Sequence, residues 1–132
     1  MENLGRIALV LSALALPASL PALAQDGDAA SGERVFRQCM ACHAVGEGAQ
    51  NKIGPQLNEL IGRQPGSLES YTYSPAFVAF GEGKTWDAAL LNEFLAAPRS
   101  VVKGTKMAYP GLRNDKQRAD VIAYIESFST GQ

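Results

Sequence analysis

Two cysteines and one histidine have the most specific chemistry in this chain, and they lie in one pentapeptide. Cys39 and Cys42 are the only cysteines and His43 is the only histidine, in the segment Cys-Met-Ala-Cys-His. Two thiols separated by two residues can bond to the two vinyl groups of a haem, and the next imidazole can then bind the iron. The motif therefore predicts one covalently attached c-type haem, with His43 as an axial ligand.

Three other uses of these side chains fit the sequence less well. A thioredoxin-like dithiol needs a βαβ context, whereas the flanking residues have helical character. A zinc site needs four ligands, and the pentapeptide supplies only three. A disulfide across so short a turn would be strained and would leave His43 without a role. Haem attachment accounts for all three side chains.

The second axial ligand decides whether such a haem transfers electrons or binds a substrate. Apart from Met1 the chain has Met40 and Met107, and it has no second histidine. Met40 lies inside the attachment motif and cannot reach the opposite face of the ring. Met107 lies in a glycine-bounded loop, residues 103–111. A lone loop methionine is more often a packing or surface residue, but with a haem present we predict that it binds the iron.

Helical signals dominate the chain, and no segment shows the alternation of a strand, so we expect an all-α fold. A first helix is expected from residue 28 towards 43, with Asp28 or Ser31 as its cap. Further helices are expected at Ser74-Pro75, over about 86–96 and over 114 to about 128, with a turn or short helix at 57–61 and loops at 44–53, 64–73 and 99–111. Loops this long need something to wrap around.

The first 24 residues differ from the rest and predict an export signal. An apolar run over residues 7–16 is followed by two prolines, and Ala22-Leu23-Ala24 has the small-x-small pattern of a cleavage site. A transmembrane anchor is the alternative, but it needs about 20 apolar residues and the prolines interrupt the stretch first. We expect residues 1–24 to be a cleaved secretory signal peptide, and residues 25–132 to form one periplasmic domain.

The composition argues against other classes of function. The net charge is −1 over 132 residues and no long basic run is present, so nucleic acid is not an expected partner. Five phenylalanines and one tryptophan are few for the core of so small a domain. A large buried prosthetic group would complete such a core, which agrees with the prediction of a haem.

Together these motifs make the chain resemble a class I cytochrome c, the family of mitochondrial cytochrome c and its soluble bacterial relatives. The resemblance covers roughly residues 28–128. After the attachment motif, its anchors are Gly54-Pro55-Gln56-Leu57, Gly62-Arg63, Tyr71-Thr72-Tyr73, Thr85-Trp86, Gly104-Thr105-Lys106-Met107 and Ala123-Tyr124. It implies crossing N- and C-terminal helices, with shorter helices and long loops wrapped around one covalent haem.

The resemblance also implies roles for particular residues. Met107 is similar to the family's methionine ligand, and the Pro55 carbonyl is expected to accept a hydrogen bond from the second ring nitrogen of His43. Gly32 and Phe36 match the helix face that crosses the last helix near Tyr124. The expected haem-binding set is completed by Leu57, Arg63, Tyr73, Trp86 and Thr105, of which Arg63, Tyr73 and Trp86 match residues that hold the propionates.

Some of these positions have simpler interpretations or depart from the family pattern. Trp86 and Tyr73 are also acceptable as core aromatics, and Arg63 as a solvated charge. Phe94 stands where many relatives have a tyrosine whose hydroxyl reaches the methionine sulfur. Tyr109 stands where many have a phenylalanine at the exposed haem edge.

The resemblance implies a soluble periplasmic one-electron carrier between redox complexes of a respiratory or photosynthetic chain, and not an enzyme. With His43 and Met107 on the iron, no position remains for a substrate. A haem enzyme or gas sensor with an open distal site is one alternative, but it needs a distal acid–base residue and no second histidine is present. An electron-input subunit bound to one enzyme is another, and the sequence leaves it open.

The stretch from residue 99 to residue 113 is basic although the whole chain is not. It contains Arg99, Lys103, Lys106 and Arg113 and no acidic residue. Because it includes the predicted ligand loop, we expect a basic docking face beside the haem edge for membrane or soluble redox complexes, used by a monomer. An ordinary solvated loop is the alternative.

Overall fold

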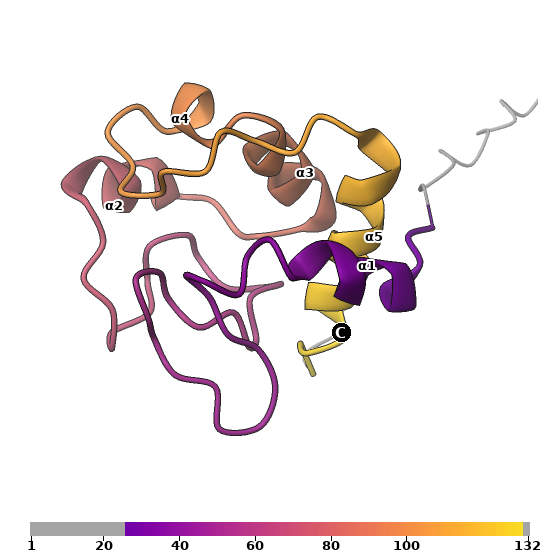
Figure 1. The fold of residues 1–132 in the computed structure, drawn as a ribbon. Helices are drawn as coiled ribbons and strands as arrows, with labels where there is room; N and C mark the ends of the chain where they lie inside the picture. The colour runs from indigo at the N-terminus through magenta and orange to yellow at the C-terminus, as the bar shows by residue number, and fades with distance from the viewer. Residues whose placement is uncertain (1–25, 131–132) are drawn as a thin grey trace, which may run out of the picture.

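The computed structural model describes residues 26–130, which form five helices joined by long loops (Figure 1). The helices are α1 (Ala29–Phe36), α2 (Pro75–Gly81), α3 (Ala88–Ala96), α4 (Pro98–Val101) and α5 (Asp115–Glu126). No strand occurs in these residues, in agreement with the predicted all-α class. None of their helices is long and apolar enough to cross a membrane. The predicted signal peptide lies outside the described residues.

Four of the helices begin at a side chain that caps the first turn. Asp28, Ser74, Asp87 and Asn114 each accept a hydrogen bond from the backbone N–H three residues later. The helix starts predicted at Ser74-Pro75 and at residue 114 are confirmed. Of the two candidate caps for α1 it is Asp28, not Ser31, that caps the helix. Local sequence therefore sets where these helices start.

Two helix boundaries differ from the sequence expectation. The segment leading to His43 begins as a helix, as predicted, but α1 ends at Phe36 and turns continue the chain. The segment 99–111, expected to be a loop, instead begins inside α4. The helix predicted to end near residue 96 does end there. Pro98 then starts α4, because proline is favourable at the first position of a helix.

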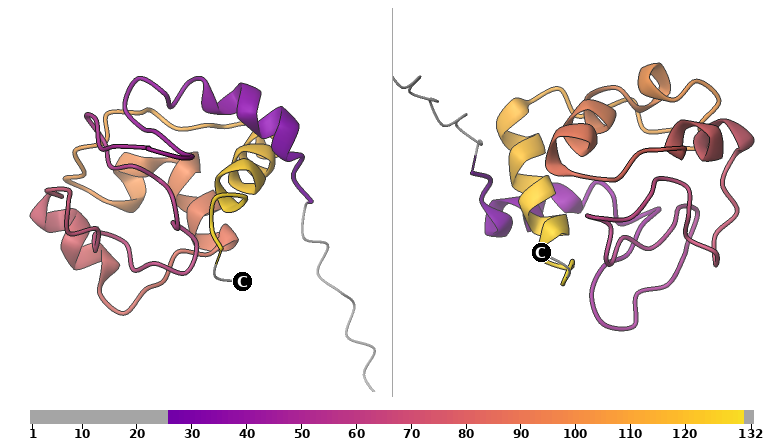
Figure 2. Two further views of the ribbon diagram at one scale, coloured as in Figure 1. Left: turned by 90° about the horizontal axis from the view of Figure 1, so that it is seen from below. Right: turned by 180° about the vertical axis from the view of Figure 1, so that it is seen from behind.

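The helices at the two ends of the domain, α1 and α5, cross each other (Figure 2). Gly32 allows this approach, since a Cβ at that position would overlap the backbone carbonyl of Asp120. The rings of Phe36 and Tyr124 pack with centroids 5.4 Å apart. The Asp120 carboxylate accepts the Asp28 N–H at 2.7 Å, which joins the start of α1 to α5. The predicted crossing of the N- and C-terminal helices is confirmed.

The core extends from this crossing to an aromatic cluster between α2 and α3. Trp86 and Phe94 are buried with ring centroids 5.4 Å apart, and Phe77 packs edge-on against Phe94 at 5.7 Å. Buried aliphatic side chains complete the core: Val35, Leu60, Ile61, Leu91, Leu95, Val102, Leu112, Val121, Ile122 and Ile125. The core therefore draws on α1, α3, α5 and the loops between them.

Candidate haem-binding site

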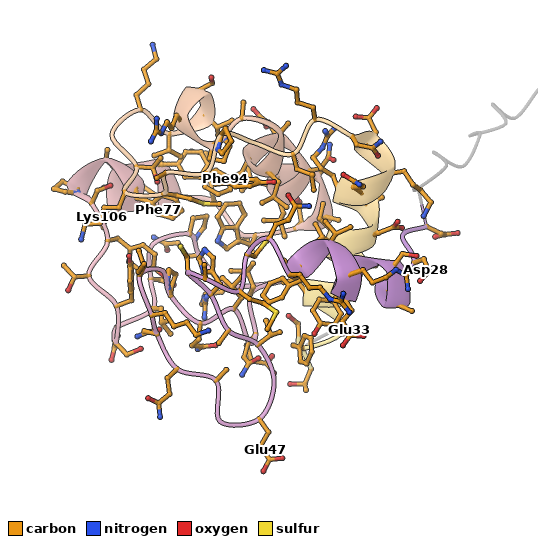
Figure 3. The ribbon with its side chains drawn as sticks, viewed as in Figure 1. Asp28, Glu33, Glu47, Phe77, Phe94 and Lys106 are labelled. Carbon is orange, nitrogen blue, oxygen red and sulfur yellow. The ribbon has the colours of Figure 1, made fainter. Side chains whose placement is uncertain are left out.

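A cavity of about 280 Å³ lies among the loops. The residues that line it come from separate segments between Val35 in α1 and Ile125 in α5. Its walls are mainly apolar and contain no Asp or Glu side chain. Phe77 and Phe94, labelled in Figure 3, belong to this lining. The structure brings together in one cavity all the residues predicted to bind the haem: Cys39, Cys42, His43, Pro55, Leu57, Arg63, Tyr73, Trp86, Thr105 and Met107.

Cys39 and Cys42 are half-buried on the same wall as His43 and do not form a disulfide. The N–H groups of Cys42 and His43 both donate to the Cys39 carbonyl, at 3.0 and 2.8 Å, and fold the segment into one tight turn. Burial, with a smaller effect of Cys42, raises the pKa of the Cys39 thiol to about 11. The sulfur is thus neutral at physiological pH, and its apolar surroundings suit a thioether, which has no charge.

The imidazole of His43 is oriented by a backbone carbonyl. Its Nδ1 lies 2.7 Å from the Pro55 carbonyl oxygen, as the resemblance implies, and donates to it when the proton is on Nδ1. This tautomer leaves Nε2 free to bind a metal. A Cβ at Gly54 would overlap the ring, so glycine allows the chain to pass this close. Burial lowers the pKa of His43 and so favours the neutral imidazole that metal binding requires.

Met107 reaches the same cavity from the loop that follows α4. Its N–H donates to the Thr105 hydroxyl at 3.2 Å. At the far end of this loop the Leu112 N–H donates to the Leu95 carbonyl at 2.8 Å, and the buried Arg118 donates to the Leu112 carbonyl at 2.7 Å. The far end of the loop is therefore fastened to the body of the domain.

Arg63, Tyr73 and Trp86 form the part of the wall best suited to anionic groups. The backbone N–H of Trp86 donates to the Arg63 carbonyl at 2.9 Å, and the backbone N–H of Gly62 donates to the Trp86 carbonyl at 2.8 Å. The Arg63 guanidinium donates to the Asn58 carbonyl at 3.3 Å, which leaves other N–H groups for a carboxylate. Burial raises the pKa of Tyr73, so its hydroxyl remains a hydrogen-bond donor.

The lining suits a haem better than a bare metal ion. In residues 26–130 no group of three or more His, Cys, Asp or Glu side chains could hold a metal ion alone. The cavity instead combines apolar walls with two thiols, an imidazole, a thioether and a guanidinium. These groups match the apolar ring, vinyl groups, iron and propionates of a haem.

Comparison with known proteins agrees with this fit, since the family model for cytochrome c matches residues 29–129. The chain belongs to the class I cytochrome c family. It is 44% identical to cytochrome c2 of Blastochloris viridis, over 92% of this chain and 93% of the relative. It is 48% identical to cytochrome c-554 of Methylosinus trichosporium, over 77% and 76% of the two chains. The solved structure of cytochrome c2 from Rhodospirillum centenum is similar with a TM-score of 0.74 and 38% identity, over 78% of this chain and 99% of the other.

Membership of the cytochrome c family gives the cofactor and the general role. The protein has one covalently attached haem c with iron. It is an electron carrier of a bacterial respiratory or photosynthetic chain and not an enzyme. The arrangement of its helices is the class I cytochrome c fold.

Sequence reasoning did not identify several residues that line the cavity of this cytochrome. Val121 and Ile125 line it from α5, and their helical spacing with Tyr124 indicates an apolar face without showing what that face contacts. Gln38 and Ile53 also line it, and neither has a sequence signal. Their positions depend on how the loops fold.

Proposed function

We propose that Cys39 and Cys42 form the covalent bonds to the haem, and that His43 and Met107 are the axial ligands of its iron. The observation that supports this best is that His43 and Met107, far apart in sequence, line one cavity together with both thiols. When bound, the haem iron supplies one-electron exchange between its ferric and ferrous states. With both axial positions filled, the protein is a soluble periplasmic one-electron carrier.

The chain's own residues set the properties of the proposed axial ligands. The Pro55 carbonyl fixes the tautomer of His43 and makes its Nε2 a stronger ligand. The Met107 thioether is neutral and favours ferrous iron, which raises the reduction potential relative to a second imidazole. Apolar walls exclude water and disfavour the additional positive charge of ferric iron.

The remaining predicted residues hold the rest of the group. Arg63, Tyr73 and Trp86 would hold the propionates through hydrogen bonds, and Leu57 would pack against the ring. Thr105 contributes through its hydrogen bond to the Met107 N–H. The buried ring of Trp86 and the fastened backbone of Arg63 support these roles, because both groups are already positioned at the cavity wall.

A haem enzyme or gas sensor would use the same cavity differently. It needs an open axial position and a distal acid–base residue. The lining contains no Asp or Glu, and His43 is the only histidine of the chain. An electron-input subunit bound to one enzyme would instead co-purify with that enzyme, whereas the free carrier proposed here elutes as a monomer.

We propose that Arg99, Lys103, Lys106 and Arg113 form a basic docking face for larger redox complexes. All four side chains are exposed, and Lys106 lines the cavity itself. The ion pairs found in residues 26–130 involve Lys116 and Arg118, so the four docking bases have no acidic partner there. In Figure 3, Lys106 lies on the opposite side of the molecule from Asp28 and Glu33.

We propose that the chain reaches the periplasm by export, with residues 1–24 removed as a signal peptide. The support is the apolar run and the Ala22-Leu23-Ala24 site in the sequence. The mass of the mature holoprotein tests this, since it must equal residues 25–132 plus one haem.

Replacing Met107 with alanine tests the proposed ligation. We expect Met107→Ala to lower the reduction potential and to let carbon monoxide bind the reduced protein, because the substitution opens one axial position. Met40→Ala is the control, since Met40 is 52% exposed and has no proposed role. A Met107→Ala protein that keeps the wild-type potential and excludes carbon monoxide would show that Met107 is not the ligand.

A further inference from the structure

The loop that contains Met107 is tied to the rest of the domain by two side chains close to the proposed ligand. On one side, the Lys106 ammonium donates to the Thr72 carbonyl at 2.6 Å. On the other side, the Tyr109 hydroxyl donates to Oε1 of Gln38 at 3.1 Å. Met107 thus lies between two contacts that lead to different parts of the chain.

The contact from Tyr109 has the more informative position. Gln38 directly precedes Cys39, and both Gln38 and Tyr109 line the haem cavity. Their bond is solvent-exposed and joins the segment of His43 to the segment of Met107 at the rim of the cavity. In the described chain it is the hydrogen bond that joins residues 37–43 to residues 103–111.

We propose that Tyr109 and Gln38 form a latch that keeps the Met107 loop closed, which makes Tyr109 a positioning residue for this ligand. The inference rests on the proposed ligation by Met107. The backbone of Gln38 is held to the end of α1, because its N–H donates to the Val35 carbonyl at 3.1 Å and the next residue donates to the Phe36 carbonyl at 2.7 Å. Opening the loop therefore breaks the latch.

Imidazole binding to the ferric holoprotein measures how often the loop opens. An external imidazole can bind the iron only when Met107 has left, so its apparent association constant is proportional to the opening equilibrium. The titration is done at one pH and one ionic strength with the wild type, Tyr109→Phe, Gln38→Leu and the double variant. Tyr109→Phe keeps the ring and removes only the hydroxyl.

We expect each single variant to bind imidazole two- to tenfold more tightly, as the loss of one hydrogen bond predicts. The double variant should bind no more tightly than the stronger single variant, because both substitutions break the same bond. Tyr124→Phe is the matched control, since Tyr124 of α5 packs against Phe36 of α1 and does not line the cavity. Its imidazole affinity should equal that of the wild type.

Unchanged affinity in both single variants, or effects that multiply in the double variant, would overturn the latch. Thermal unfolding of each variant separates loop opening from general instability. The latch predicts tighter imidazole binding in Tyr109→Phe and Gln38→Leu but not in a Tyr124→Phe protein of similar unfolding temperature. Carbon monoxide binding by reduced wild-type protein would overturn the Met107 ligation and the latch together. Equal imidazole constants in all variants of a protein that excludes carbon monoxide would overturn the latch alone.

Discussion

At the scale of single residues, the position of the His43 imidazole depends on a neighbour without a side chain. Gly54 passes so close to the ring that any Cβ would overlap it, and the next residue supplies the carbonyl that accepts from Nδ1 at 2.7 Å. A larger residue at 54 must displace either the ring or the backbone. Either movement disturbs the ligand that the sequence motif predicts.

Gly54→Ala should therefore destabilise the holoprotein by about 1–3 kcal/mol, the usual cost of overpacking, and should shift its reduction potential. Denaturant unfolding and redox titration measure the two effects. Gly48→Ala is a strict control, because Gly48 has a φ of 72° but no atom near an added Cβ. If Gly48→Ala costs as much stability and shifts the potential equally, the contact with His43 is not the cause.

At the scale of elements, a single carboxylate joins the two helices that cross. Asp120 on α5 accepts the Asp28 N–H at 2.7 Å and also binds the Lys116 ammonium. The hydrogen bond from Lys116, followed by that from the Asp28 backbone, lowers the pKa of Asp120 below its ordinary value. A carboxylate with a lowered pKa stabilises the folded state above its unfolded pKa, and this stabilisation is lost as the pH falls through the folded value.

Asp120→Asn should accordingly lower the stability at pH 7 and flatten its loss below about pH 4. Asparagine keeps an acceptor for the Asp28 N–H but has no charge for Lys116. Unfolding of the wild type and the variant in denaturant at pH 7 and at pH 3 gives both values. Glu47→Gln, at the exposed loop in the lower part of Figure 3, should change neither. An acid limb in Asp120→Asn that matches the wild type would contradict the role of this carboxylate.

At the scale of the whole molecule, the proposed basic docking face gives the protein a one-sided charge despite its net charge of −1. Such a field speeds encounter with an acidic partner without making a tight complex. Lys103 is the best test of this face, because its ammonium is exposed. Lys106 is less suitable, since it also holds the Met107 loop through Thr72.

Lys103→Glu should slow bimolecular electron transfer to the physiological partner, most strongly at low ionic strength. Added salt should also slow the wild type, because the Debye length shrinks to about 8 Å at physiological ionic strength. Lys84→Glu is the matched control, since Lys84 lies over the Phe80 ring and does not line the cavity. Stopped-flow rates over a range of salt concentrations decide the question. Equal slowing by both variants, or rates indifferent to salt, would reject the basic face.

The haem-attachment motif, several helix starts and the candidate methionine ligand could be predicted from the sequence, because each depends on local chemistry. The attachment motif is contiguous, so its spacing alone indicates a haem. Ser74 and Asn114 indicate helix starts, because a capping side chain bonds to the N–H only three residues later. Met107 was predicted as the second iron ligand by elimination, since Met40 lies inside the attachment motif. In each case the interaction is short in sequence or the candidates are few.

The tertiary structure alone decided how the loops meet. Tyr109 and Gln38 are 71 positions apart, and Lys106 and Thr72 are 34 apart. Neither pair has a periodicity or a motif that links its members. Such contacts depend on the summed conformations of loops between helices, which no local preference specifies. The same reason explains Pro98: its backbone restriction indicates that α3 ends there, but only the packed chain shows that a new helix begins.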